Sequence, residues 1–155
     1  MRKGLHYFLL LALAATACAP APQTDKTPKA GSEMSRAVID PYLKIQAALA
    51  DDSMDGVKAN AGDIATAATS LGAPAMKIDT AALQLASATE IDDARPKFAA
   101  LSEAIDAYMT GLKLKAPDGV KVAVCPMLHK PWLQASAAIE NPYFGKSMLT
   151  CGSFR

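Results

Sequence analysis

The chain has 155 residues, of which 51% are hydrophobic and 20% are charged, and its 16 basic and 15 acidic residues give a formal net charge of +1. This length suits one domain with a hydrophobic core. A nearly neutral chain without a cluster of basic residues speaks against a nucleic-acid partner, because such a surface needs concentrated positive charge.

The first 17 residues have the pattern of a bacterial lipoprotein signal peptide. Arg2 and Lys3 are followed by an apolar run over residues 5–17, which is shorter than the ~20 residues of a membrane-spanning helix. The small residues 15–17 before Cys18 resemble a lipobox, in which the cysteine becomes the lipidated N-terminus. The alternative is ordinary cleavage nearby, which would leave Cys18 as a free thiol.

This N-terminus predicts residues 1–17 as signal peptide and lipid attachment at Cys18. The protein is then expected in the bacterial periplasm, held to a membrane by its lipid. An aspartate directly after the lipidated cysteine would resemble an inner-membrane retention signal. Position 19 is alanine instead, which favours the outer membrane. Residues 18–34 are rich in Pro, Lys and Thr and predict a flexible tether. A single domain is expected over residues 35–155.

Four segments then show apolar residues at helical spacing. Pro41 lies inside the first segment, so the helix either kinks there or begins with Asp40 as its N-cap. Asp92 and Asp93 suit the start of the fourth, where carboxylates favour the helix dipole. The predicted inward positions are Val38, Tyr42, Ile45 and Leu49; Val57, Ala61, Ile64, Ala68 and Leu71; Ile78, Ala82 and Leu85; and Ala94, Phe98, Leu101, Ile105, Tyr108 and Leu112.

Short connections between these segments predict a mainly α fold, an antiparallel four-helix bundle. The C-terminal tail differs in character. Residues 120–124 alternate Val with other residues, which indicates a strand. Residues 140–145 have the composition of a turn, with Pro142 suited to its second position and Gly145 able to take positive φ. We therefore expect the tail to fold back on the bundle as a short β-hairpin or a turn-rich segment.

The tail also gathers sulfur. Along an extended chain Cys125, Met127 and His129 would project to one side, and Met148 and Cys151 are brought together by one turn. If the 140–145 turn reverses the chain, these two groups converge. Thiolates and thioethers favour Cu(I), and imidazole suits copper or zinc. Zinc fits less well, because a closed structural zinc site needs four Cys or His ligands and the tail has three.

Two other interpretations of the same residues remain open. Cys125 and Cys151 could form a structural disulfide, worth ~3.5 kcal/mol by the chain-entropy estimate. They could also form a redox-responsive site that alternates between disulfide and metal. A disulfide does not explain the nearby methionines, and this favours the metal. Trp132 would either shield such a site or anchor the tail to the bundle.

The motif formed by residues 125–127, Trp132, Ile139, residues 141–145 and residues 148–152 resembles a bacterial domain of unknown function. That domain occurs alone in secreted proteins and at the C-terminus of periplasmic adaptor proteins of copper/silver efflux systems. Residues 36–152 are similar to it. The resemblance implies copper or other heavy-metal handling outside the cytoplasm, with an efflux component as partner, and its Cys and Met positions are matched here, whereas His129 lies outside its pattern.

Catalysis has little support in the sequence. After removal of the signal peptide one histidine remains, and no GxSxG, HExxH or phosphate-binding glycine loop is present. The chain is therefore predicted not to be an enzyme. The first hypothesis is a lipid-anchored Cu(I)-binding protein that buffers copper or passes it to an efflux system. The second is a disulfide-stapled module that docks on an envelope protein and has no metal role.

Overall fold

The computed structural model describes residues 32–155. The predicted signal peptide, Cys18 and all but the last three residues of the predicted tether lie outside the described residues. Folded contacts extend to Ser32, whereas the sequence placed the domain boundary at residue 35. The Lys115 N–H donates to the Ser32 carbonyl over 2.9 Å, and the Met34 N–H donates to the Lys115 carbonyl over 2.8 Å. The Met34 side chain is buried in the core.

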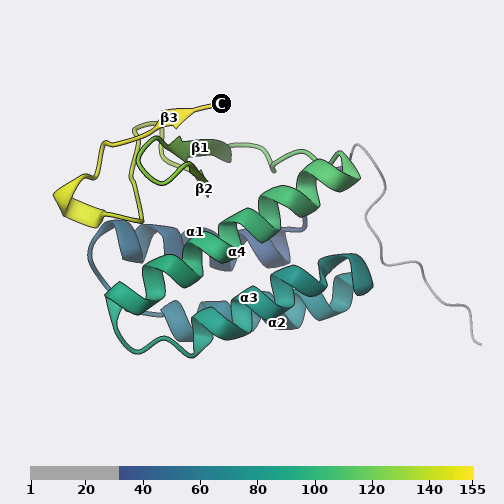
Figure 1. Ribbon diagram of the computed structural model, residues 1–155. Coiled ribbons are helices and arrows are strands. Elements are labelled where there is room, and N and C mark those ends of the chain that lie inside the picture. The colour runs from purple at the N-terminus through teal and green to yellow at the C-terminus, as the bar shows by residue number, and fades with distance from the viewer. Residues whose placement is uncertain (1–31) are drawn as a thin grey trace, which may run out of the picture.

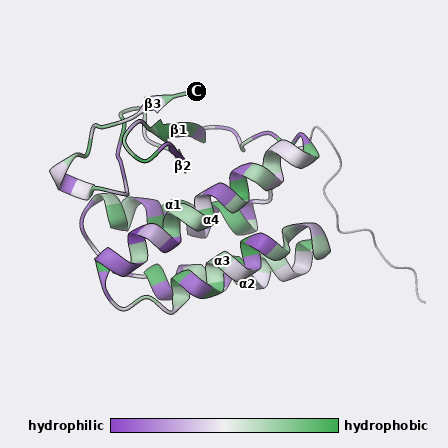
Figure 2. Ribbon diagram, in the orientation of Figure 1, coloured by the Kyte–Doolittle hydropathy of each residue, from purple (hydrophilic) through white to green (hydrophobic). Residues whose placement is uncertain are grey.

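Residues 32–155 contain four α-helices and one short 3₁₀ turn between the second and third. Their bounds are α1 Arg36–Ala50, α2 Val57–Leu71, η1 Ala73–Ala75, α3 Met76–Ala86 and α4 Ile91–Leu112. Hydrophobic and hydrophilic bands alternate along these helices, as expected of amphipathic segments (Figure 2). Every inward position predicted from the spacing is buried, except Leu71 and Leu112, which are partly buried against the core.

Helix α1 runs through Pro41 without ending there. It begins after Ser35, so the alternative of a start at Asp40 is wrong. Proline at this position removes one N–H donor from the helix. Apolar side chains on both sides of the proline, Val38 and Tyr42, are fully buried on the same face. Tertiary packing therefore holds the helix together across the missing hydrogen bond.

The tail forms a small antiparallel sheet in the order β2-β1-β3. Its strands are β1 Lys121–Cys125, β2 Lys130–Gln134 and β3 Ser153–Phe154, and the 3₁₀ turn η2 spans Gly145–Ser147. The strand predicted at residues 120–124 is confirmed, and a hairpin is present, but its turn lies at residues 126–129 and not at the predicted turn 140–145. The third strand, in which Ser153 pairs with Val124, was not predicted. The described part of the chain is thus mainly helical with a three-stranded antiparallel sheet at its C-terminal end.

The elements lie in three layers (Figure 1). Helices α2 and α3 form one outer layer, α1 and α4 the middle layer, and the sheet the other outer layer, with β2 packed on α1 and α4. Tyr42 of α1 and Phe98 of α4 stack with ring centroids 4.8 Å apart. The Tyr42 hydroxyl bonds to Ser102 Oγ at 2.6 Å and accepts the Leu133 N–H of β2 at 3.2 Å. This tyrosine therefore joins two helices to the sheet.

Trp132, on β2, packs against other parts of the tail. Its side chain is fully buried, and its ring meets the Tyr143 ring edge-on with centroids 5.8 Å apart. The indole N–H donates to Gln134 Oε1 over 2.8 Å. The buried ring fits the predicted role of aromatic anchor. It also lies against Gly152, the neighbour of Cys151, and the shielding role stays a prediction.

Candidate soft-metal site

One cysteine of the tail lies on β1 and the other lies just before β3, the strand that pairs with it. Cys125 ends β1 and is fully buried, and Cys151 precedes β3 and is half-buried. Both are free thiols. Val124 pairs with Ser153, so continuing the register by one residue sets Gly152 beside Cys125, with Cys151 directly before it. The two segments that carry the cysteines therefore meet at one end of the sheet.

The expectation that Cys125, Met127 and His129 share one side of an extended chain is wrong. Residues 126–129 form the turn of the β1–β2 hairpin, closed by the His129 N–H, which donates to the Cys125 carbonyl over 2.8 Å. The φ angle of His129 is +55°, a left-handed conformation that reverses the chain. As a result Met127 is 62% exposed at the turn while Cys125 faces the core, and His129 is exposed.

The predicted turn between Met148 and Cys151 is present. The Cys151 N–H donates to the Met148 carbonyl over 3.0 Å, which closes the turn. Met148 is 36% exposed. Gly145, the last residue of the predicted 140–145 turn, has φ +55°, as its position in the sequence suggested.

One cavity borders both sulfur-bearing turns. Its volume is about 400 Å³, and Leu128 and Ser147, the neighbours of Met127 and Met148, both line it. The rest of its wall comes from α4 and the 140–145 turn: Asp92, Arg95, Pro96, Ala99, Tyr143 and Phe144. A shared cavity means that the turn with Met127 and the turn with Met148 lie at the same end of the molecule. Burial raises the pKa of Tyr143, which keeps its hydroxyl neutral on this wall.

No group of three or more His, Cys, Asp or Glu side chains within residues 32–155 is arranged to hold a metal ion. The donors that the tail does offer are two thiols and two partly exposed thioethers. These fit a soft, monovalent ion better than a divalent one.

The 140–145 turn is clasped to the helices by Arg95, which sequence reasoning missed. The Arg95 guanidinium donates to the Pro142 carbonyl over 3.1 Å, to the Leu49 carbonyl over 3.1 Å and to Asp52 Oδ1 over 2.5 Å. The other oxygen of Asp52 accepts the Lys146 N–H over 3.3 Å. Each of these partners of Arg95 is more than 40 residues away from it in the chain, so no local sequence pattern could predict the contacts.

The clasp predicts a specific acid sensitivity. Hydrogen bonding by Arg95 holds the pKa of Asp52 below its ordinary value of 3.8. A carboxyl with a lowered folded-state pKa contributes stability above the unfolded-state value, and that contribution disappears as pH falls through the lowered pKa. We expect urea unfolding of the wild type to lose stability below about pH 4, and D52N to lose less over the same window. Asp55→Asn, at an exposed position nearby, is the control; an equal acid response in D52N and wild type would contradict the prediction.

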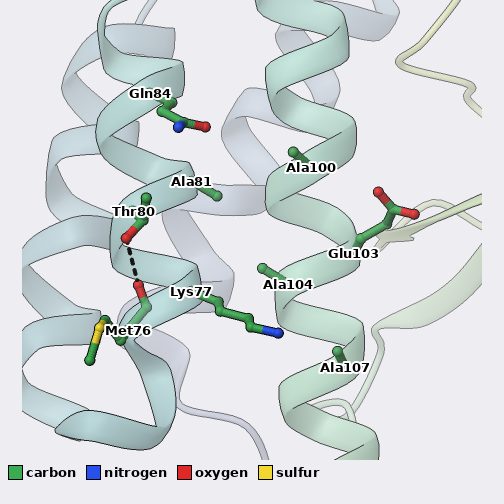
Figure 3. A pocket seen from close by; sticks show the side chains of 9 residues that line it. All are labelled: Met76, Lys77, Thr80, Ala81, Gln84, Ala100, Glu103, Ala104 and Ala107. Carbon is green, nitrogen blue, oxygen red and sulfur yellow. Dashed lines mark hydrogen bonds between the residues drawn. The ribbon is translucent and has the colours of Figure 1, made fainter.

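A second cavity of about 470 Å³ lies between α3 and α4 (Figure 3). Four alanines line it, and Lys77 and Glu103 are its charged residues. The Glu103 carboxylate already binds Lys130 Nζ at 2.5 Å. The cavity is therefore lined mainly by small side chains.

Comparison with known proteins found no family model, no curated protein and no solved structure that matches this chain. Within the described residues no helix is long and apolar enough to cross a membrane.

Proposed function

We propose that this protein binds Cu(I) through the thiolates of Cys125 and Cys151, with the thioethers of Met127 and Met148 as further donors. The observation that carries the proposal is the pairing of β3 with β1, which brings the two cysteine segments together. Thiolate and thioether are the soft donors that Cu(I) prefers. His129, exposed on the hairpin turn, is the remaining candidate donor.

The exposure of the donors suggests an order of capture. Met127 and Met148 lie at the surface, Cys151 is half-buried and Cys125 is inside. An incoming ion would meet the thioethers first and then move to the thiols, each of which releases its proton on binding. The apparent affinity should therefore rise with pH. The antiparallel four-helix bundle predicted from the sequence would serve as scaffold, with no catalytic role.

The proposed setting follows from the sequence. A lipid on Cys18 would hold the protein at the periplasmic face of the bacterial outer membrane, with residues 18–34 as tether. In that position the protein would buffer Cu(I) or pass it to a heavy-metal efflux component. Both roles need reversible binding, which a site with partly exposed thioethers allows.

The test is a Cu(I) competition titration of the reduced mature protein with a chromogenic chelator. We expect C125S/C151S to lower the affinity about 100-fold and M127L/M148L about 10-fold, since loss of a ligand or its support commonly costs this much. Met76→Leu is a matched control, because Met76 is 62% exposed, as Met127 is, but lies on α3. Equal affinities of wild type and C125S/C151S would reject the site.

A second candidate function is a disulfide-stapled interaction module without a metal. The pairing of β3 with β1 supports it as well, because it brings the Cys151 segment beside the Cys125 segment. Exposed apolar residues on the two turns, Met127, Leu128 and Met148, would suit a protein partner. Intact mass of periplasmic protein after alkylation, with and without reductant, separates the two. Thiols that are alkylated without reduction would reject the staple.

A further inference from the structure

Asn141 links the beginning of the loop over residues 141–151 to the end of that loop at Cys151. Its side chain is fully buried. Its backbone N–H donates to the Leu149 carbonyl over 2.7 Å, and its Nδ2 donates to the Cys151 carbonyl over 2.6 Å. Its Oδ1 accepts the Tyr143 N–H over 2.8 Å, and its own carbonyl accepts the Gly145 N–H over 3.1 Å.

Beyond the pairing of β3 with β1 and the packing of Gly152 against Trp132, little holds the Cys151 end of this loop. Lys146, Ser147, Met148 and Thr150 are exposed, so apolar burial contributes little there. The bond from Asn141 Nδ2 is the one side-chain hydrogen bond found to Cys151 within residues 32–155. Because the Asn141 amide is buried, water competes little for this part-buried bond, and losing it leaves the Cys151 carbonyl without its side-chain partner.

We propose that Asn141 is a positioning residue for the metal site: its side-chain amide fixes the backbone of Cys151, and thereby the thiol, beside the end of β1. This inference rests on the proposed Cu(I) site. The geometry fits the task, since one buried amide caps the 141–143 turn with its oxygen and fastens the 148–151 turn with its nitrogen. The loop is thus set before an ion arrives, which lowers the ordering entropy that binding must offset.

Asn141→Ser separates the two functions of the amide. A serine hydroxyl can still accept the N–H two residues on, as in an ST-turn, but is too short to bond the Cys151 carbonyl. The matched control is Gln46→Ala. Gln46 is also buried and donates from Nε2 to the Glu140 carbonyl over 2.8 Å, so it braces the tail next to Asn141 without touching Cys151.

The experiment is the chelator titration with Cu(I), run on wild type, N141S, Q46A and C125S/C151S, with the urea midpoint of each. We expect N141S to bind Cu(I) about tenfold more weakly and Q46A to bind within about threefold of wild type. Equal losses in N141S and Q46A, or wild-type affinity in N141S, would overturn the role. A failure of N141S to fold would also overturn it, because Asn141 would then hold the whole domain rather than the Cys151 segment.

Asn141→Asp supplies a readout that a general loss of stability would not produce. The charged carboxylate would face the Cys151 carbonyl and repel it, whereas the protonated acid can donate a hydrogen bond as the amide does. The affinity of N141D relative to wild type at the same pH should therefore recover as pH falls. A ratio that does not change with pH would contradict the role. If wild type and C125S/C151S have the same Cu(I) affinity, the proposed Cu(I) function is wrong. If C125S/C151S binds more weakly but N141S binds as wild type does, only the role of Asn141 is wrong.

Discussion

Replacing Trp132 with Ala is expected to destabilise the protein by about 3–5 kcal/mol, the usual cost of removing a fully buried aromatic ring. The ring is 0% exposed and lies against Tyr143 and Gly152. Its loss would leave Tyr143 without its edge-on neighbour and Gln134 Oε1 without the indole donor. Since whole domains have about 5–15 kcal/mol of stability, this change alone brings the fold close to its limit.

Urea unfolding monitored by far-UV circular dichroism measures the effect. Trp132→Phe should lose less, about 1–3 kcal/mol, because an aromatic ring remains and only the indole donor and some volume disappear. Leu83→Ala is the control: Leu83 is 56% exposed on α3, and exposed substitutions usually stay within about 0.5 kcal/mol. A loss in W132A no larger than in L83A would show that the indole does not anchor the tail.

The helical half of this fold could be predicted from the sequence because its signal is local. Apolar side chains three and four residues apart lie on one face of a helix, and the predicted inward residues of all four helices are buried or partly buried. The strand at residues 120–124 and the positive φ of Gly145 followed in the same way from short patterns. The effect of Pro41 was the exception, since packing of Val38 and Tyr42 outweighed the local preference.

The candidate site was predictable in outline only. The return of the Cys151 segment to the Cys125 segment was expected from the turn residues and is seen as the pairing of β3 with β1. The direction of each side chain was not predictable, because the 126–129 turn depends on His129 taking a left-handed conformation that few residues adopt. Met127 therefore ends at the surface although it lies two residues from a buried cysteine.

The supports of the site were out of reach for a different reason. Arg95 and Asp52 are 43 residues apart, and Asn141 and Cys151 are 10 apart, with no shared periodicity between them. Such contacts depend on how the tail packs on the helices. This packing cannot be predicted from short sequence patterns. The one signal available for Asn141 was its place before Pro142, where asparagine commonly caps a turn with its side chain.

Gly145→Ala is expected to destabilise the protein by about 2–4 kcal/mol, because two costs act at once. A residue with Cβ loses about 1–2 kcal/mol in the left-handed conformation that Gly145 adopts at φ +55°. The new methyl group would also overlap Asp52 Oδ1 and Arg95 Nη2, so the ion pair that clasps the tail would have to open. Displacing Arg95 would also break its part-buried hydrogen bonds to the Pro142 and Leu49 carbonyls, which costs about 1–2 kcal/mol.

Gly62→Ala gives a control of opposite sign. Gly62 lies inside α2, and a methyl group added there would meet no heavy atom within 4 Å, so alanine should stabilise the helix by up to about 1 kcal/mol. D52A/G145A tests the cause: removing the carboxylate that the methyl group meets should make the double variant more stable than the sum of the single losses predicts. Strictly additive losses would mean that the cost of G145A comes from backbone conformation alone. Unchanged stability in G145A would show that the Arg95–Asp52 ion pair does not hold the tail.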